Sequence, residues 1–165
     1  MAATASWQYS IHAPSAYVVA HQSQLLPAWS RPIASVLIAL QHCPTALWDR
    51  VEASEQAKDC LRAQFLAFGQ GLVAANHGPE ELIEIFDPRT GLPTRSPAGT
   101  LCLDDVAIAQ TALGYPTVRR GGCLLLLHPR WGAQVYPSVI MASVSPARLQ
   151  QWAEAAAQPD WGAAC

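Results

Sequence analysis

The sequence predicts one domain of the α+β class. Residues 35–40, S-V-L-I-A-L, form a compact apolar run that is typical of a buried strand. Residues from about 47 to 76 carry apolar side chains every three or four positions, which is typical of a long helix. The run C-L-L-L-L-H at 123–128, followed by a turn and a strand-like segment at 133–144, predicts a hairpin with 123–128 as a central strand. We therefore expect a mainly antiparallel sheet packed against helices.

The length agrees with a single domain. A chain of 165 residues lies within the usual range of about 100–200 residues for one domain. We expect residues 1–157 to form this domain and 158–165 to be a flexible tail. Only 13% of the residues are charged, whereas about 25% is usual. This shortage of charge indicates a covered face or a partner, or follows simply from the high alanine content.

The charge pattern argues against two classes of partner. There are 10 basic and 12 acidic residues, and the basic ones form no stripe, whereas nucleic-acid binding needs clustered Lys and Arg. No apolar run approaches the roughly 18 residues that a membrane span requires. Residues 1–6 lack the basic and apolar regions of a signal peptide. We expect a soluble cytoplasmic protein that binds neither nucleic acid nor membrane.

The cysteines give no sign of a disulfide framework or a metal site. Their number is odd and none lies in a C-x-x-C spacing, so we expect reduced thiols. His42 and Cys43 are adjacent, and Cys123 and His128 are five apart, so each pair would point to opposite faces of a strand. We expect no metal ligands. The five cysteines are Cys43, Cys60, Cys102, Cys123 and Cys165.

In the first half of the chain, two short strands precede the elements already described. Alternating apolar residues at 7–12 predict a half-buried strand, and Tyr17 to Val19 suggests another. In the long helix, Leu61, Phe65, Phe68 and Leu72 step by four, three and four and should share one face. Gly78 and Pro79 end this helix in the expected way.

In the second half, residue types mark turns and helix ends. Residues 82–86 predict a short strand, and Asp87 to Gly91 predicts a turn in which Gly91 adopts a positive φ. Asp104 is the expected N-cap of a short helix that ends at Gly114. Ser145-Pro146 is a strong start signal for a final helix. Pro137 predicts a bulge or a strand edge.

Few residues suggest chemistry. Asp104 and Asp105 could form a carboxylate pair, but an N-cap followed by an acid in the first helical turn explains both. The chain has neither a G-x-S-x-G elbow nor a G-x-G-x-x-G phosphate loop. Cys123 follows Gly121-Gly122 and two arginines, which suits either a reactive thiolate or an inert thiol buried in a strand.

Three blocks of sequence carry a family resemblance. They are I-E-I-F-D-P-R-T-G-L at 83–92, L-G-Y at 113–115 and G-G-C-L-L-L-L-H-P-R-W-G at 121–132. In order and spacing they resemble the C-terminal domain of the CblD family, named for methylmalonic aciduria and homocystinuria type D, in a short form of bacterial type. The resemblance covers roughly the second half of the chain. The motif residues are Asp87, Pro88, Gly91, Leu113, Gly114, His128, Trp131 and Gly132.

The resemblance implies a nitroreductase-like fold without flavin or catalytic activity. Proteins of this family act as adapters that join a CblC-like cobalamin-processing protein and direct cobalamin to its dependent enzymes. One cysteine of an adjacent pair in the family ligates cobalt as a thiolate. The first cysteine of the pair, which is the one that binds cobalt in the animal proteins, matches Gly122 here, and the second matches Cys123. Cys123, preceded by Gly121 and Gly122, is therefore the one candidate cobalt ligand at this place in the chain. Cobalamin would be bound transiently.

Two other functions fit the sequence. One is a flavin-dependent oxidoreductase on the same nitroreductase-like fold. The other is a structural or assembly protein that binds no small ligand.

Overall fold

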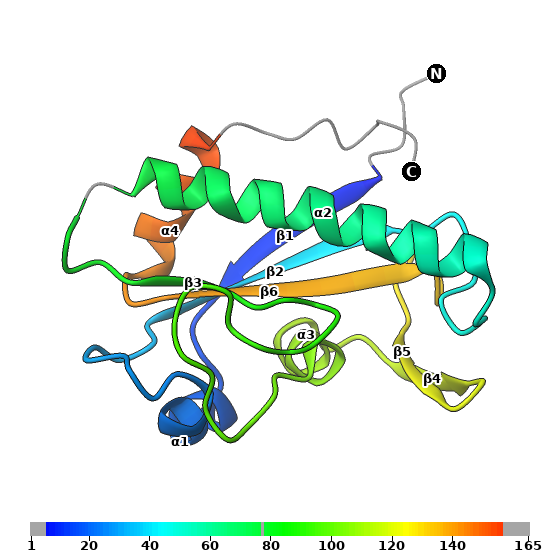
Figure 1. Cartoon of the computed structure of the whole chain (residues 1–165), viewed down its shortest axis with the longest axis horizontal. Helices are drawn as coiled ribbons and strands as arrows, with labels where there is room; N and C mark the ends of the chain where they lie inside the picture. Colours follow the sequence, from blue (N-terminus) through cyan, green and yellow to red (C-terminus); the bar gives the residue numbers. More distant parts are fainter. Residues whose placement is uncertain (1–5, 77, 157–165) are drawn as a thin grey trace.

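A computed structural model describes residues 6–76 and 78–156 and confirms an α+β protein. The described chain holds four helices, a mainly antiparallel four-stranded sheet of order β1-β2-β6-β3, and a separate two-stranded hairpin, β4-β5 (Figure 1). In chain order the elements are β1 (Trp7–His12), α1 (Ala16–Leu25), β2 (Ser35–His42), α2 (Glu52–Ala75), β3 (Ile83–Ile85), α3 (Asp105–Leu113), β4 (Thr117–Arg120), β5 (Cys123–Leu126), β6 (Val135–Ala142) and α4 (Pro146–Ala155).

The ladder between β2 and β6 forms the centre of the sheet. These two strands pair in antiparallel register from Ser35↔Ala142 to His42↔Val135, and almost every residue in both is buried. A strand is apolar along its whole length only when both faces of its sheet are covered. Helices α2 and α4 cover one face, and α1 and α3 lie on the other (Figure 1).

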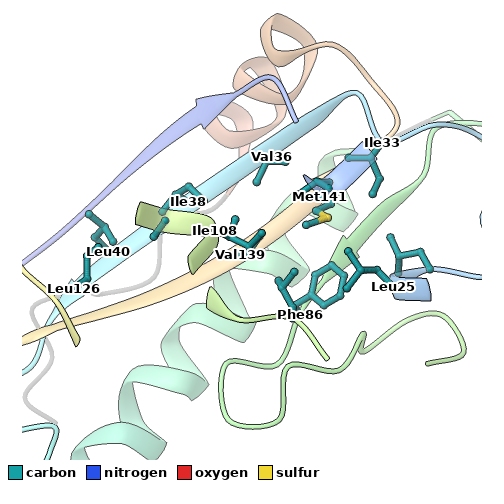
Figure 2. Close-up of a cluster of buried hydrophobic side chains, with 14 of the residues drawn as sticks. Leu25, Ile33, Val36, Ile38, Leu40, Phe86, Ile108, Leu126, Val139 and Met141 are labelled. Atoms are coloured by element: carbon teal, nitrogen blue, oxygen red, sulfur yellow. The ribbon is translucent and has the colours of Figure 1, made fainter. Parts of the chain in front are cut away.

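Each face has its own core. Alternate residues of β2 and β6, such as Ile38 and Val139, point toward α1 and α3 and pack there with Phe86 and Ile108 (Figure 2). Residues between them point toward α2 and α4. The predicted stripe on the long helix is confirmed, since its members are all buried: Leu61, Phe65, Phe68 and Leu72.

The predicted helix ends are confirmed. The Asp104 carboxylate accepts a hydrogen bond from the Ala107 N–H at 3.0 Å and caps α3. Gly114 ends that helix in the left-handed conformation, with φ of 70°. The Ser145 hydroxyl accepts from the Arg148 N–H at 3.3 Å, and Pro146 is the first residue of α4.

The prediction of a strand at residues 17–19 is wrong, because these residues lie in α1. Tyr17 and Val19 favour strands by intrinsic propensity, but both are exposed. Ser15 decides the local structure, since its hydroxyl accepts from the Val18 N–H at 3.2 Å and caps the helix.

The predicted pairing of residues 123–128 with 133–144 is also wrong. β5 pairs with β4, and β6 pairs with β2 and β3. The two glycines at 121 and 122 fold β5 back onto the preceding strand, so residues 123–128 are not a central strand. Between residues 127 and 134 only an isolated bridge, His128↔Gly132, remains of the expected hairpin.

Three smaller expectations concern Pro137, the cysteines and the tail. Pro137 lies in a part of β6 that β3 does not reach, so it occupies a locally open edge as predicted.

Cys43, Cys102 and Cys123 are free thiols, but Cys60 is disulfide-bonded, and the expectation of reduced cysteines is wrong there. Residues 158–165 lie outside the described residues.

No helix within the described ranges is both long and apolar enough to span a bilayer.

Candidate ligand site

The first motif block forms a tight turn held by Asp87. The Asp87 carbonyl accepts from the Gly91 N–H at 2.7 Å, and its carboxylate accepts from the Arg89 N–H at 2.9 Å. Gly91 has φ of 70°. Both predictions for this turn are confirmed. The Gly91 carbonyl then accepts from the Leu103 N–H at 2.8 Å, which ties the turn to the segment ahead of α3.

Arg62 of α2 anchors this turn. Its Nε and Nη2 donate to the two carboxylate oxygens of Asp87 at 2.8 and 2.5 Å. Such a two-point contact fixes direction as well as distance. The Arg62 hydrogen bonds lower the pKa of Asp87, because they stabilise the ionised carboxylate more than burial disfavours it.

Two glycines build the hairpin from which Cys123 projects. Gly121 and Gly122 have φ of 55° and 79°, as a two-residue type I′ turn requires. Gly121 lies close to Trp48, since a Cβ atom there would be 3.1 Å from the Trp48 carbonyl oxygen. A Cβ at Gly122 would meet nothing within 4 Å, so that side of the turn is open. The hairpin explains both glycines whether or not they also contact a ligand.

Cys123 is neither fully exposed nor in the centre of the core. It is a half-buried free thiol on the first residue of β5. It packs at the margin of a small cluster that includes Leu47, Leu61 and Leu125. Neither alternative from the sequence, a reactive thiolate or an inert buried thiol, is excluded. The residue contacts the core and is also partly accessible.

The second half of the third block is a turn organised by His128. Its Nδ1 accepts hydrogen bonds from the N–H groups of Arg130 and Trp131 at 3.1 and 3.2 Å. Trp131 stacks on the imidazole with ring centroids 4.0 Å apart. Burial, with a smaller effect from Arg130, lowers the pKa of His128, so the ring stays neutral over a wider pH range. Gly132 closes the turn with φ of 56°.

The second block contacts the third. Leu113 and Gly114 end α3, and the next residue, Tyr115, lies edge-on to His128 with centroids 5.8 Å apart. The second and third blocks therefore lie together, and residues of the first block line a pocket with β5. The pocket described next is lined by none of the following motif residues: Leu113, Gly114, His128, Trp131 and Gly132.

A pocket of about 390 Å³ lies between β5, β6, the start of α3 and the turn after β3. Pro88 and Cys123 line it, and they come from the first and third motif blocks. Its other walls are largely apolar, and Tyr136, Asp105, Lys58 and Arg89 supply polar groups: the full lining is Leu47, Lys58, Pro88, Arg89, Asp105, Val106, Cys123, Leu124, Leu125, Leu126, Val135, Tyr136 and Pro137.

Two polar atoms of this lining lack a hydrogen-bond partner among the described residues. The hydroxyl of Tyr136 is one, although the residue is only 8% exposed. Oδ1 of Asp105 is the other; the residue as a whole is half-buried, but this atom is buried. Burial raises the pKa of Asp105, with further contributions from the charges of Asp104 and Asp87. Burial also raises the pKa of Tyr136, so its hydroxyl keeps its proton.

The two basic residues of the pocket are already paired. Lys58 donates to Glu55 Oε1 at 2.8 Å, and Arg89 donates to Glu55 Oε2 at 2.5 Å. These hydrogen bonds lower the pKa of Glu55 to about 2. Arg89 Nε also lies 3.8 Å from Asp59 Oδ1, so the two cations at the rim face two carboxylates, whereas Oδ1 of Asp105 has no partner among the described residues.

Sequence reasoning missed Tyr136 and underrated Asp105. The N-cap explanation is correct for Asp104, but it leaves a buried oxygen of Asp105 without a partner. A Tyr in an otherwise apolar strand, next to Pro137, was the available signal for Tyr136. The described residues contain no group of three or more His, Cys, Asp or Glu side chains that could hold a metal ion.

Comparison with known proteins adds no name to this site. No protein-family model matches the chain, and no curated protein sequence matches it.

Proposed function

We propose that this protein is a cobalamin-handling adapter of the CblD type with a nitroreductase-like fold. It would hold a corrinoid beside Cys123 while a CblC-like cobalamin-processing protein is bound, and release it toward cobalamin-dependent enzymes in the cytoplasm. The corrinoid is cargo in this role, and the protein itself catalyses no reaction.

The position of Cys123 is the observation that carries the proposal. A thiol can ligate cobalt only as an accessible thiolate. Cys123 is a half-buried free thiol that lines a pocket, next to a turn where Gly122 leaves open space. A macrocycle could approach the sulfur from the side of Gly122. A larger side chain at residue 122 would obstruct this approach.

The hairpin also supports an adapter role. Arg119 and Arg120 are exposed on β4, next to the turn that precedes Cys123. Guanidinium groups form two-point contacts with carboxylates. A partner with an acidic surface would therefore bind here and be placed beside the corrinoid.

The test is to mix the protein with aquocobalamin and record the absorbance spectrum. We expect a shift of the thiolate-ligation type that is lost in Cys123→Ser. Cys102→Ser is the matched control, because Cys102 is also a free thiol but is exposed and outside the pocket. A shift that survives in Cys123→Ser, or the absence of any shift with and without a CblC-like partner, would contradict ligation by Cys123.

Partner binding needs a separate experiment. A pulldown from the native host should recover a CblC-like protein with the unmodified chain. Recovery should fall when Arg119 and Arg120 are both replaced by Glu. If the purified protein is instead yellow with a flavin spectrum, the oxidoreductase alternative replaces the adapter proposal.

A further inference from the structure

We propose that the pocket between β5, β6 and α3 binds an uncharged ligand by an amide group, a carboxamide or a lactam. This inference does not depend on cobalamin or on Cys123. Two buried polar atoms, the balance of charge around them and the apolar walls carry it.

The Tyr136 hydroxyl is the first of these atoms. The residue lines the pocket and is only 8% exposed, and its buried hydroxyl has no partner among the described residues. Leaving a buried hydroxyl without a partner is costly, and native proteins seldom do so without a functional reason. Because burial raises its pKa, this hydroxyl is a donor that a ligand carbonyl would satisfy.

Asp105 supplies the second atom. Its Oδ1 is buried and unpartnered among the described residues, and Asp105 lines the same pocket as Tyr136. An ionised carboxyl accepts a hydrogen bond from a ligand N–H, and a protonated one also donates to a ligand carbonyl. An amide has both groups side by side and therefore fits either protonation state.

The charges around the pocket disfavour charged ligands. A cation would lie near Lys58 and Arg89, whose carboxylate partners, Glu55 and Asp59, are already engaged. An anion would lie against the carboxyl of Asp105, and neither basic group is left unpaired to neutralise it. Burying an unpaired charge is far more costly than burying a neutral polar group.

The remaining walls determine the rest of the ligand. Leu124, Leu126, Val106, Val135 and Pro137 face the space, so an apolar body would pack against them. The volume of about 390 Å³ lies in the range of about 300–1,000 Å³ that is usual for small-molecule sites. An aromatic or aliphatic amide meets these requirements.

Three probes of one shape separate the alternatives. Benzamide is neutral, benzoate is an anion and benzamidine is a cation. We expect only benzamide to bind saturably, in titrations followed by saturation-transfer NMR and calorimetry on the full chain. Tighter binding of benzoate or benzamidine than of benzamide overturns the proposal, as does the absence of saturable binding by all three.

Two variants connect binding to the named atoms. Tyr136→Phe removes only the hydroxyl and should weaken benzamide binding by about two- to tenfold, the usual effect of one hydrogen bond. Asp105→Ala removes the other partner and should weaken it at least as much. Tyr17→Phe is the matched control, because Tyr17 is exposed and outside the pocket. Unchanged affinity in both pocket variants overturns the proposal.

The melting temperature of Tyr136→Phe shows whether weaker binding reflects the missing hydroxyl or a damaged fold. Tyr136→Phe deletes a buried hydroxyl that has no partner, so its melting temperature should equal or exceed that of the unmodified chain. A clear fall would assign the hydroxyl to the structure and not to a ligand. The cobalamin spectrum depends on Cys123, so the two proposals fail or succeed separately.

Discussion

Two glycines with the same backbone angle offer a controlled experiment at the level of single residues. Gly91 and Gly114 both have φ of 70°. A Cβ at Gly91 would lie 2.5 Å from the Leu103 carbonyl oxygen, whereas one at Gly114 would meet nothing within 4 Å. Gly114→Ala should therefore show only the cost of the left-handed conformation, about 1–2 kcal/mol.

Gly91→Ala should lower the free energy of unfolding by at least about 1 kcal/mol more than Gly114→Ala does. The reason is that the added methyl group must displace backbone atoms of Leu103. Gly91→Val should be worse still, since β-branched residues tolerate a positive φ poorly. Urea unfolding of the variants measures the difference. Equal losses for the two alanine variants would contradict the close contact with Leu103.

Asp87 makes stability depend on pH through its ion pair with Arg62. Its pKa is lowered in the folded protein from 3.8, so this contribution is present above the unfolded value and is lost as pH falls through the lower folded value. Asp87→Asn should cost about 1–2 kcal/mol at pH 7, a modest figure because Arg62 is partly exposed.

The difference between wild type and Asp87→Asn should shrink as pH falls below about 4, where the wild-type carboxylate begins to lose its advantage. Unfolding free energies at a series of pH values check this. A difference that stays constant from neutral to strongly acidic pH would show that the carboxylate charge is unimportant to the turn.

The dihedral preferences of these turn residues were predictable from the sequence, but the pocket atoms were not. Asp bonds the backbone ahead of it, Pro fixes φ and Gly tolerates a positive φ, so the residue types from Asp87 to Gly91 predict the turn. An unpartnered hydroxyl depends on which side chains from distant segments surround it. Tyr136 looked like an ordinary strand residue for this reason.

At the level of elements, a buried carboxylate joins β3 to the segment that follows it. Glu84 is completely buried. Its Oε1 accepts from the N–H groups of Ile85, Thr94 and Arg95, each at 2.9 Å, and Ser96 donates to Oε2. This one side chain therefore accepts from one backbone donor of β3 and from two of the irregular segment that follows it.

Glu84→Ala should destabilise the protein by about 3 kcal/mol or more, because the N–H groups of Ile85 and Arg95 and the hydroxyl of Ser96 lose their acceptor. Glu84→Gln is the informative control, since its oxygen can still accept and its amide can donate to Ser96. Thermal and urea unfolding should rank the proteins as wild type, Gln, then Ala. A glutamine variant as unstable as the alanine one would show that the charge matters more than the hydrogen bonds.

Helices with polar caps were predictable, and strand partners were not. Ser145-Pro146 and Asp104 act through neighbours three residues away, so local sequence suffices. The partner of β5 depended on whether the chain turned at Gly121-Gly122 or at 129–132. Both segments carry turn residues, and only the packing of Trp48 and the rest of the core distinguishes them.

At the level of the whole molecule, the two cores share the same central strands. Trp152 is buried on the side of α4, and Trp131 packs against the opposite core. Because β2 and β6 contribute to both, neither core can persist without the other. We expect one cooperative transition, with coincident curves from tryptophan fluorescence and far-UV circular dichroism.

A plateau between two transitions would contradict this expectation and would identify one face as an independent unit. The Phe65→Ala and Ile108→Ala variants sharpen the test, because each creates a cavity on a different face. Both should lower the midpoint of the same single transition.

The central pairing of β2 with β6 also has a consequence for biosynthesis. β2 leaves the ribosome early, but its partner is made only after most of the described chain has been translated. Pairing over so long a separation is entropically costly and slow. Until β6 emerges, the largely apolar strand β2 can pair with β1 on one side only. A strand with one open edge is the kind of segment that chaperones bind and that promotes aggregation when synthesis is fast.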